Sequence, residues 1–220
     1  MAGMRTNERV SRTLAALTLV AAISAAAPQS IAAQQAPAPM VDVKAAGGEQ
    51  TAILAGGCFW GMEAIFERLE GVKDVVSGFS GRGSPGPVGP MPYAEVVKIT
   101  FDPAKVSYGT LLRVFFGVAH DPTQLNRQGP DEGPLYRSSI FFVDDDQKGV
   151  AEAYIRQLET ARLFPRPIVT TVVRFDSFHV AGPEHQDFVR RNPTSPYVVQ
   201  VDMPKIVHLE QDYAPLLKRR

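Results

Sequence analysis

The alternation of apolar and polar residues predicts strands interleaved with helices between residues 51 and 191. Period-two alternation and short β-branched runs are typical of strands, whereas apolar residues spaced three and four apart are typical of helices. On this basis we predict strands at 51–54, 72–79, 95–101, 139–143 and 168–175. The helical spacing predicts helices over about 61–69, after a cap at Ser107, over about 146–161 and over 183–191. This order of elements predicts an α/β (α+β) fold, a single-domain sandwich of one mixed β-sheet with packed helices, ferredoxin-like in arrangement.

The residues outside this pattern divide the chain further. Arg5, Arg9 and Arg12 precede the uncharged run 14–27, and small residues at 30–33 fit a cleavage site, so residues 1–33 read as a secretory signal peptide. The apolar run is shorter than the ~20 residues of a membrane helix. We therefore expect an exported protein, periplasmic or secreted, without a stable membrane anchor.

Two further segments lack periodicity. Residues 34–50 are rich in Ala, Pro, Gln and Gly, which predicts a flexible linker. The residues after 191 carry little pattern, and we expect an extended C-terminal tail that wraps the surface. Residues 51–220 then form the one predicted domain, a suitable size for a single core.

Composition narrows the functional classes. The formal charge is balanced, and the one basic block is the terminal 218–220, so nothing favours nucleic acid. A single cysteine excludes an internal disulfide framework and a Cys-based zinc site. We expect a monomer.

The run Gly56–Gly61 holds the single cysteine and the single tryptophan. Cys58 lies where a predicted strand leads into a helix, a position at which free N–H groups and the helix dipole favour a thiolate and lower the thiol pKa. The alternative is an inert, buried small residue. Phe59 and Trp60 are either ordinary core aromatics or the walls of a pocket of methyl size.

Glu95 is the candidate acid. It shares the apolar face of its predicted strand with Val97, Ile99 and Phe101. It is either a strand-end residue that reaches water or a partly buried acid with a raised pKa, able to donate a proton. The long, polar and irregular segment 120–138 is typical of functional loops.

Several motifs together resemble one family. They occur in the order Gly57-Cys58-Phe59-Trp60-Gly61, Ala94-Glu95-Val96, Tyr108 with Leu111-Leu112 before Phe115-Phe116, His120-Asp121-Pro122-Thr123, Arg127 to Gly133, Tyr136-Arg137-Ser138, His185-Gln186 and Asn192-Pro193. Over roughly residues 51–205 the chain resembles peptide methionine sulfoxide reductase A.

The resemblance implies a role for each matching residue. Cys58 resembles the nucleophile that attacks the sulfoxide sulfur, and Glu95 the acid that protonates the departing oxygen. Tyr136 resembles a tyrosine that donates to that oxygen, and Asp131 an acid that holds the network. Phe59 and Trp60 resemble the walls around the sulfur-bound methyl group.

The resemblance also implies the reactants. The substrates would be proteins or peptides that contain methionine S-sulfoxide, or the free amino acid, and no cofactor or metal would be bound. Family members often carry further cysteines that resolve the sulfenic acid, and this chain has none. The reductant would be an external dithiol, such as a thioredoxin-like protein.

The segment before Glu95 departs from the family pattern. Members usually have a longer segment there, with a second oxygen-binding tyrosine and a His-Ala-Glu ending, whereas this chain reads Tyr93-Ala94-Glu95. That tyrosine has no aligned counterpart. Because Tyr93 precedes Glu95 by two residues, its side chain would leave an extended chain on the same face and could supply the hydrogen bond. The alternative is that Tyr93 is an exposed aromatic residue at the end of the loop.

Two rival functions stay open. A cysteine hydrolase would place Cys58 before His179 or His185 and Asn192, in the papain-like order. A non-catalytic binder of oxidised-methionine peptides would keep the pocket without turnover, and the shortened loop is its support.

Overall fold

The computed structural model describes Met1 and residues 35–44, 47–82, 85–86, 89–90 and 92–219. The predicted signal peptide, apart from Met1, lies outside the described residues. The folded unit extends from residue 34 to residue 220.

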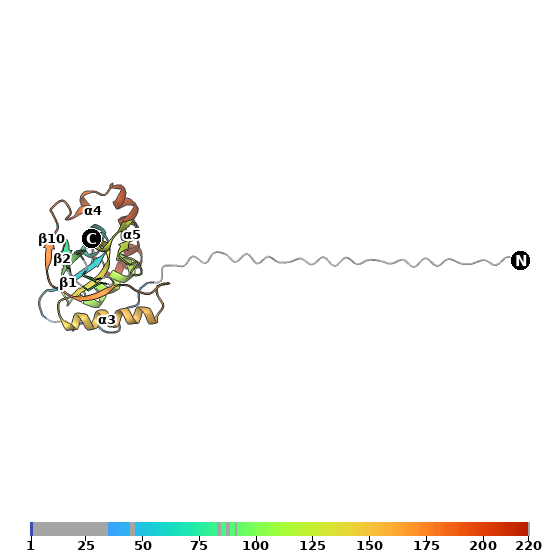
Figure 1. The fold of residues 1–220 in the computed structure, drawn as a ribbon, viewed down its shortest axis with the longest axis horizontal. Coiled ribbons are helices and arrows are strands. Elements are labelled where there is room, and N and C mark those ends of the chain that lie inside the picture. Colours follow the sequence, from blue (N-terminus) through green and yellow to red (C-terminus); the bar gives the residue numbers. More distant parts are fainter. Residues whose placement is uncertain (2–34, 45–46, 83–84, 87–88, 91, 220) are drawn as a thin grey trace. The chain divides into compact units, whose positions relative to one another are not determined.

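One six-stranded sheet forms the centre of this unit (Figure 1). Its strands follow the order β10-β2-β5-β1-β8-β9. Neighbouring strands are antiparallel except for the parallel pair β8 and β9, so the predicted mixed sheet is confirmed. The strand bounds are β1 (Gln50–Gly56), β2 (Val72–Ser80), β5 (Ala94–Phe101), β8 (Ser138–Phe142), β9 (Thr171–Arg174) and β10 (Phe178–Val180).

Two short hairpins lie outside the sheet. They pair β3 (Pro85–Gly86) with β4 (Gly89–Pro90), and β6 (Arg127–Gln128) with β7 (Asp131–Glu132). The second hairpin orders part of the long polar segment that precedes β8.

The helices begin at the caps that the sequence provides. Ser107 accepts a hydrogen bond from the Thr110 N–H, and Asp144 accepts one from the Gln147 N–H, which satisfies otherwise free donors at two helix starts. The helical segments are α1 (Phe59–Glu67), α2 (Tyr108–Val114), the π-turn η1 (Phe115–Ala119), the 3-10 turn η2 (Pro134–Tyr136), α3 (Asp145–Thr160), α4 (Phe188–Arg191), the π-turn η3 (Val198–Asp202), α5 (Met203–Asp212) and the 3-10 turn η4 (Ala214–Leu216). Within the described residues, we find no helix with the length and apolar character required to cross a membrane.

The main core lies between one face of the sheet and the helices. The predicted stripe of α1 is buried there, against the face of β5 that carries Val97, Ile99 and Phe101. Each large apolar side chain removed from water in this way contributes about 1.5–3 kcal/mol. A smaller cluster covers the opposite face of the sheet and contains Ile53, Ala55, Ala94, Val96 and Phe141.

The segment predicted as a flexible linker is anchored to the folded unit by Ala36 and by several hydrogen bonds, although most of its described residues are exposed. Ala36 has no exposed surface, and its N–H donates to the Tyr213 hydroxyl at 3.1 Å. The Tyr154 hydroxyl donates to the carbonyl of Pro37 at 2.7 Å. An extended Ala/Pro segment makes few backbone hydrogen bonds of its own. Here side chains of α3 and of the C-terminal region supply the hydrogen-bond partners, and these residues lie too far along the chain for a local sequence pattern to connect them.

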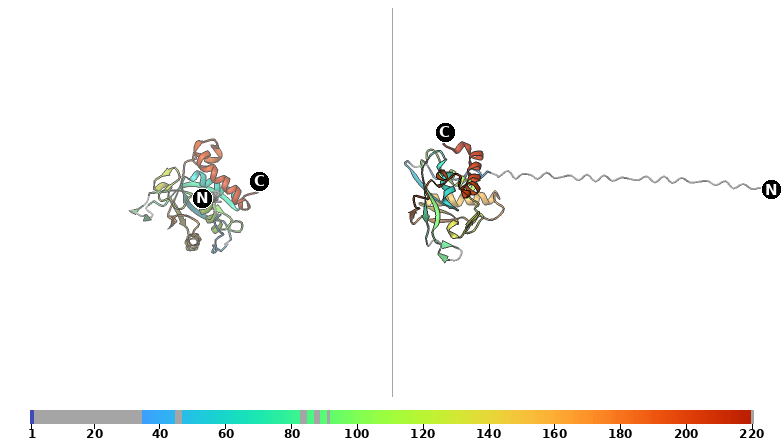
Figure 2. Two further views of the ribbon diagram at one scale, coloured as in Figure 1. Left: turned by 90° about the vertical axis from the view of Figure 1, so that its right-hand side faces the viewer. Right: turned by 90° about the horizontal axis from the view of Figure 1, so that it is seen from above.

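The predicted C-terminal tail is also different in the structure, because it forms α5. Val198, Ile206 and Leu209 are buried, and α5 packs against α1 (Figure 2). Pro204 is compatible with this helix because it lies in the first turn, where the backbone N–H has no partner within the helix.

Other boundaries changed less. The strand predicted at 168–175 is limited to β9, and the helix predicted at 183–191 is limited to α4. Strand β10 was not predicted. The first helix begins at Phe59, two residues earlier than its apolar stripe indicates.

The sheet register brings the predicted site residues to one end of the sheet. Strand β1 is antiparallel to both β5 and β8. Gly56 at the end of β1 therefore pairs with Ser138 at the start of β8. The start of β5 lies at the same end. The chain that leaves β1 at Cys58 therefore emerges beside Glu95 and Tyr136.

Candidate active site

Cys58 is the N-cap residue of α1, as the sequence predicts for a strand that leads into a helix. Its side chain makes no capping hydrogen bond and is 9% exposed. The turn before it requires glycine, because Gly57 has φ +94° and a Cβ there would lie 2.5 Å from Gln128 Cγ. The loop that carries β6 thus packs directly under the turn that presents the thiol.

Glu95 occupies the start of β5 with its carboxyl directed toward the same turn. Its Oε2 accepts a hydrogen bond from the Phe59 N–H at 3.0 Å, and the residue is 8% exposed. Burial raises the pKa of Glu95 to about 7, opposed by the Phe59 hydrogen bond and supported by the charge of Asp131. Of the two alternatives from the sequence, the structure therefore favours the buried acid.

The charge state of the thiol differs from the sequence-based expectation. Burial raises the pKa of Cys58, and the negative charges of Glu95 and Asp202 raise it further. A hydrogen bond with the backbone of Trp60 and one with the side chain of Tyr197 act in the opposite direction. Loss of hydration and two nearby carboxylates thus outweigh the helix N-terminus, and the resting group is a thiol.

Asp131 and Tyr136 lie in the same site, as predicted. Burial raises the pKa of Tyr136, and the charges of Glu95, Asp131 and Cys58 add to the effect, which places the phenol among these three groups. Asp131 also raises the pKa of Glu95. The structure therefore brings together Cys58, Glu95, Asp131 and Tyr136.

The sequence analysis missed Tyr197, which precedes η3. Its hydroxyl donates to Oδ2 of Asp131 in a short hydrogen bond and also forms a side-chain hydrogen bond with Cys58. Tyr197 follows Cys58 by far too many residues for local periodicity to connect them. The available signal was the position of Tyr197 four residues after the Asn192-Pro193 motif.

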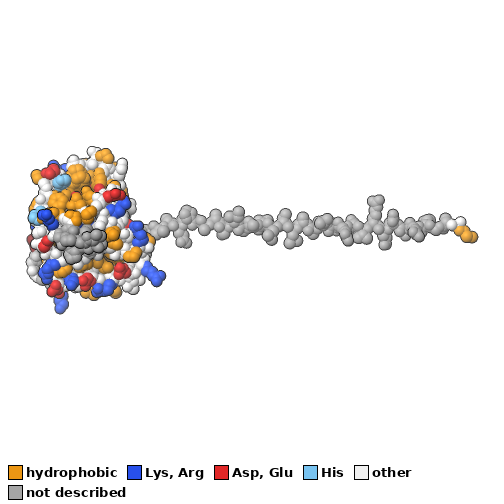
Figure 3. All heavy atoms as spheres, in the orientation of Figure 1, with side chains coloured by type: hydrophobic (Ala, Val, Ile, Leu, Met, Phe, Trp, Pro, Cys, Tyr) orange, Lys and Arg blue, Asp and Glu red, His pale blue; other side chains and the backbone are white. Residues whose placement is uncertain are grey.

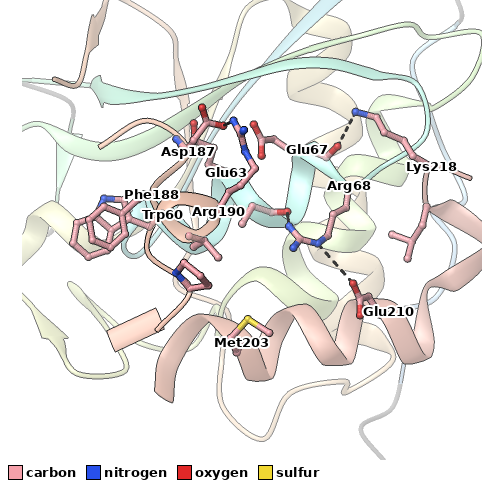
Figure 4. Close-up of a pocket in the computed structure, with 14 residues that line it drawn as sticks. Trp60, Glu63, Glu67, Arg68, Asp187, Phe188, Arg190, Met203, Glu210 and Lys218 are labelled. Carbon is pink, nitrogen blue, oxygen red and sulfur yellow. Dashed lines mark hydrogen bonds and ion pairs between the residues drawn. The ribbon is translucent and has the colours of Figure 1, made fainter. Parts of the chain in front are cut away.

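Phe59 and Trp60 form an aromatic cluster at the start of α1. The Trp60 ring stacks on Phe188 with centroids 3.6 Å apart and an interplanar angle of 8° (Figure 4). Its indole N–H donates to Nδ1 of His185 at 3.2 Å, and Tyr197 meets the ring edge-on. Phe59 contacts Phe79 and His185. Three fixed contacts on one indole produce a rigid aromatic wall next to the thiol.

The surroundings of this wall contain both apolar and charged side chains. On the face drawn in Figure 3, apolar side chains gather over α4 among charged ones. A cavity of about 540 Å³ between α1, α4 and α5 is bordered by Trp60, Phe188 and Met203. Trp60 therefore borders a groove whose wall also carries charged side chains, among them Glu67, Arg190 and Lys218. Neither Cys58 nor Glu95 lines this groove.

Tyr93 lies at a different position from the other predicted residues. Its hydroxyl is hydrogen-bonded to Nε2 of His179 at 3.0 Å, and its ring contacts the same imidazole edge-on. His179 pairs with Phe79, which pairs with Glu95 across the strands, so these side chains share one face. Tyr93 therefore lies at the rim, with its hydroxyl already bound.

The histidines show no thiol–imidazole pair within the described residues. His185 uses Nδ1 to accept from Trp60, and Nε2 lies 3.7 Å from Oε1 of Glu184. His120 is buried, with its ring nitrogens hydrogen-bonded to the Phe115 carbonyl and the Ser138 hydroxyl. The hydrolase alternative requires a base on Cys58, and the neighbour of the thiol is instead a carboxyl group.

A group of carboxylates lies beside α1. Oxygens of Glu63, Glu67 and Asp187 lie within 4.8 Å of one another. However, Oε2 of Glu63 accepts from the Ser77 hydroxyl and the Asp187 N–H, each at 3.1 Å, and Asp187 is paired with Arg190. These partners already account for the group without a metal ion.

Comparisons with known proteins agree with the geometry. The family model described as peptide methionine sulfoxide reductase matches residues 50–215. The chain is 49% identical to peptide methionine sulfoxide reductase MsrA 2 of Mesorhizobium japonicum, over 82% of this chain and 95% of that protein. It is 49% identical to the MsrA 2 of Synechocystis over 83% of this chain and 90% of the relative.

Solved structures give the same result. Methionine sulfoxide reductase A of Corynebacterium diphtheriae is 30% identical, with a TM-score of 0.55 over 70% of this chain and 79% of that one. Mxr1 from Saccharomyces cerevisiae in reduced form is 28% identical, with a TM-score of 0.55 over 67% of this chain and 87% of that one. The chain belongs to the peptide methionine sulfoxide reductase family.

Proposed function

We propose that this protein reduces methionine S-sulfoxide, free or in proteins, to methionine, with Cys58 as the nucleophile. The observation that carries the proposal is the arrangement of a cysteine at a helix start with a buried carboxyl, Glu95, on the neighbouring N–H. Breaking a sulfur–oxygen bond needs a nucleophile on sulfur and a proton for oxygen. A carboxyl group with a pKa of about 7 can hold that proton near neutral pH.

The proposed step transfers oxygen between two sulfur atoms. The Cys58 thiol gives up its proton, and its sulfur attacks the sulfoxide sulfur to form a sulfur–sulfur bond while Glu95 protonates the sulfoxide oxygen. The sulfur–oxygen bond of the substrate and the new sulfur–sulfur bond then break as the hydroxyl group passes to the Cys58 sulfur. The substrate sulfur is reduced by two electrons to the thioether, and Cys58 is oxidised by two electrons to a sulfenic acid, whose proton balances the one lost from the thiol. Tyr136 donates to the oxygen, Asp131 holds the network, and Phe59 and Trp60 enclose the sulfur-bound methyl group.

An external thiol completes the cycle in this proposal. Because the chain has a single cysteine, no internal thiol can attack the sulfenic acid. One external thiol would form a mixed disulfide with release of water, and a second would restore Cys58. We propose a thioredoxin-like protein as the donor.

The test is a dithiol-dependent assay of both methionine sulfoxide epimers on the purified protein. We expect turnover of the S epimer and none of the R epimer, and no turnover with Cys58→Ser. Binding of the S epimer without turnover would instead support the non-catalytic alternative, and hydrolysis of a simple ester that depends on Cys58 would support the hydrolase.

We further propose that the enzyme acts outside the cytoplasm. Support comes from the three arginines and the uncharged run within residues 1–33. Fractionation of cells that express the full chain, or the chain without residues 2–33, tests this. Recovery of both forms in the cytoplasm would contradict export.

A further inference from the structure

Asp202 is a buried carboxylate whose position has no structural explanation. It is 1% exposed, and neither carboxylate oxygen has a hydrogen-bond partner within the described part of the chain. It is the last residue of η3, which continues directly into α5, so it lies inside a continuous helical segment, and its side chain makes no capping bond. A buried carboxylate without a partner is costly and is retained where the charge has a use.

The carboxylate points toward the first turn of the nucleophile's helix. A Cβ on Gly61 would collide with Oδ1 of Asp202, so the two helices meet here with only a glycine between the carboxylate and the α1 backbone. Gly61 lies three residues after Cys58, and the charge of Asp202 acts on the thiol. Asp202 is therefore a second carboxylate near the start of α1, and it comes from the C-terminal helical segment, whereas Glu95 comes from the sheet.

Lys205 lies on the same face of α5, three residues later. It is partly buried, and burial lowers its pKa while interactions with Asp202, Cys58 and Asp131 raise it. On its other side it faces His120, whose pKa is lowered to about 4 chiefly by burial and further by Lys205. Lys205 lies one helical turn from Asp202 on the helix that packs against α1, and its positive charge acts on the buried carboxylate.

We propose that Asp202 and Lys205 are positioning residues that set the charge state of the Cys58 sulfur, Lys205 favouring the thiolate and Asp202 opposing it. This inference rests on the proposed role of Cys58 as nucleophile. Too free a thiolate in an oxidising compartment would be consumed by oxidants other than substrate. The opposed charges keep the sulfur a thiol at rest and leave a cation to stabilise the thiolate during attack.

The remaining groups around the sulfur do not reproduce this arrangement. The titratable and charged groups that face Cys58 are Glu95 from β5, Tyr136 from η2, Tyr197 before η3, and Asp202 and Lys205 from the C-terminal helix, with Asp131 of β7 linked to all but Cys58. Lys205 is the cation of the set. Removing Lys205 and removing Asp202 must therefore change the thiolate population in opposite directions.

The experiment measures the rate at which iodoacetamide alkylates Cys58 at about pH 8, where carboxylates such as Asp202 are ionised. We expect Asp202→Asn to increase the rate roughly three- to tenfold and Lys205→Met to decrease it by a similar factor. Lys205→Arg keeps the charge and should stay close to the parent. Glu210→Gln removes the same charge as Asp202→Asn at an exposed site on α5 and should have no effect.

The opposite signs distinguish an electrostatic role from a packing defect. Thermal unfolding confirms that each variant is folded, and if Asp202→Asn does not fold, the pair Lys205→Met and Lys205→Arg decides alone. Rates that move in the same direction, or Lys205→Arg behaving like Lys205→Met, would overturn the proposal. The assay contains no sulfoxide, so its failure is separate from failure of the reductase activity.

Discussion

Glu95 accepts a hydrogen bond from the backbone N–H of Phe59, the residue that follows Cys58, at 3.0 Å. This bond fixes a carboxyl from the start of β5 at the helix start that presents the thiol. The proximity also couples their charges, because ionised Glu95 raises the pKa of Cys58. A site with one proton to distribute between a thiol and a carboxyl is suited to move that proton during the reaction.

The first prediction concerns the proton donor. Glu95→Gln keeps the shape of the side chain but cannot donate a carboxyl proton, and we expect the reduction rate to fall by about 10²–10⁴. Since the pKa of Glu95 is about 7, the parent rate should fall as pH rises through this value, and the variant should lose that dependence. Single-turnover rates between about pH 5 and 9 measure both.

Glu63→Gln is the matched control. Glu63 is also buried, and burial is the main cause that raises its pKa to about 7. Its carboxylate accepts hydrogen bonds from the Ser77 hydroxyl and the Asp187 N–H, away from the thiol. Its variant should keep the parent pH profile. A Glu95→Gln enzyme with the parent rate and profile would assign Glu95 to structure alone.

The second prediction is the pH dependence of stability. Glu95 has a folded-state pKa of about 7 against an ordinary value of 4.5, because burial penalises its charge. The folded state therefore binds the Glu95 proton more tightly than the unfolded state does. The stabilisation of the fold that results is fully present below about pH 4.5 and is lost as the pH rises to about 7. This effect changes the free energy of unfolding by at most about 3 kcal/mol.

Urea unfolding at several pH values measures this effect. The free energy of unfolding of Glu95→Gln, relative to the parent, should increase between about pH 4.5 and 7. A constant difference across this range would contradict a raised pKa.

The third prediction compares two tyrosines. Tyr136 lies among Glu95, Asp131 and Cys58, whereas the hydroxyl of Tyr93 is bound to His179. A lost hydrogen bond in a buried site costs about 1–3 kcal/mol, so Tyr136→Phe should slow the reductive step roughly 5- to 150-fold. We expect a smaller loss for Tyr93→Phe. If Tyr93→Phe is the slower variant, Tyr93 must leave His179 and bind the sulfoxide oxygen, as the sequence suggested.

The fourth prediction tests the aromatic wall. Phe188 stacks on Trp60, and an aromatic pair contributes about 0.5–1.5 kcal/mol beyond area burial. Phe188→Ala should raise KM for methionine sulfoxide by up to about tenfold with a smaller change in kcat, because the indole loses its support. An unchanged KM would show that the remaining contacts of Trp60, with His185 and Tyr197, are sufficient.

Local sequence patterns were enough for the elements that present Cys58 and Glu95. The period-two alternation of β5 and the apolar stripe of α1 depend on neighbouring residues only, so the strand, the helix and the face on which Glu95 lies followed from them. Whether the Glu95 carboxyl is buried did not follow. The pKa of Cys58 did not follow, because it depends on carboxylates from other elements. The helix N-terminus pointed to a lowered pKa, and burial with Glu95 and Asp202 raises it.

Residues after 191 show the limit more clearly. Tyr197, Asp202 and Lys205 reach the site because α5 packs on α1, a contact between segments more than 100 residues apart. Tyr197 and Asp202 precede α5, which has a proline in its first turn, and the sequence after 191 shows little periodic pattern. The anchored segment 35–44 is similar, because its hydrogen bonds depend on tyrosines far along the chain.

The central claim is that Cys58 takes the oxygen of methionine S-sulfoxide, and a single-turnover reaction without reductant tests it most directly. Because the chain has one cysteine, we predict about one methionine per chain and one dimedone adduct, located on Cys58 by mass spectrometry. Cys58→Ser should remain folded and yield neither. Two or more equivalents of methionine from the parent, or methionine formed by Cys58→Ser, would contradict the account.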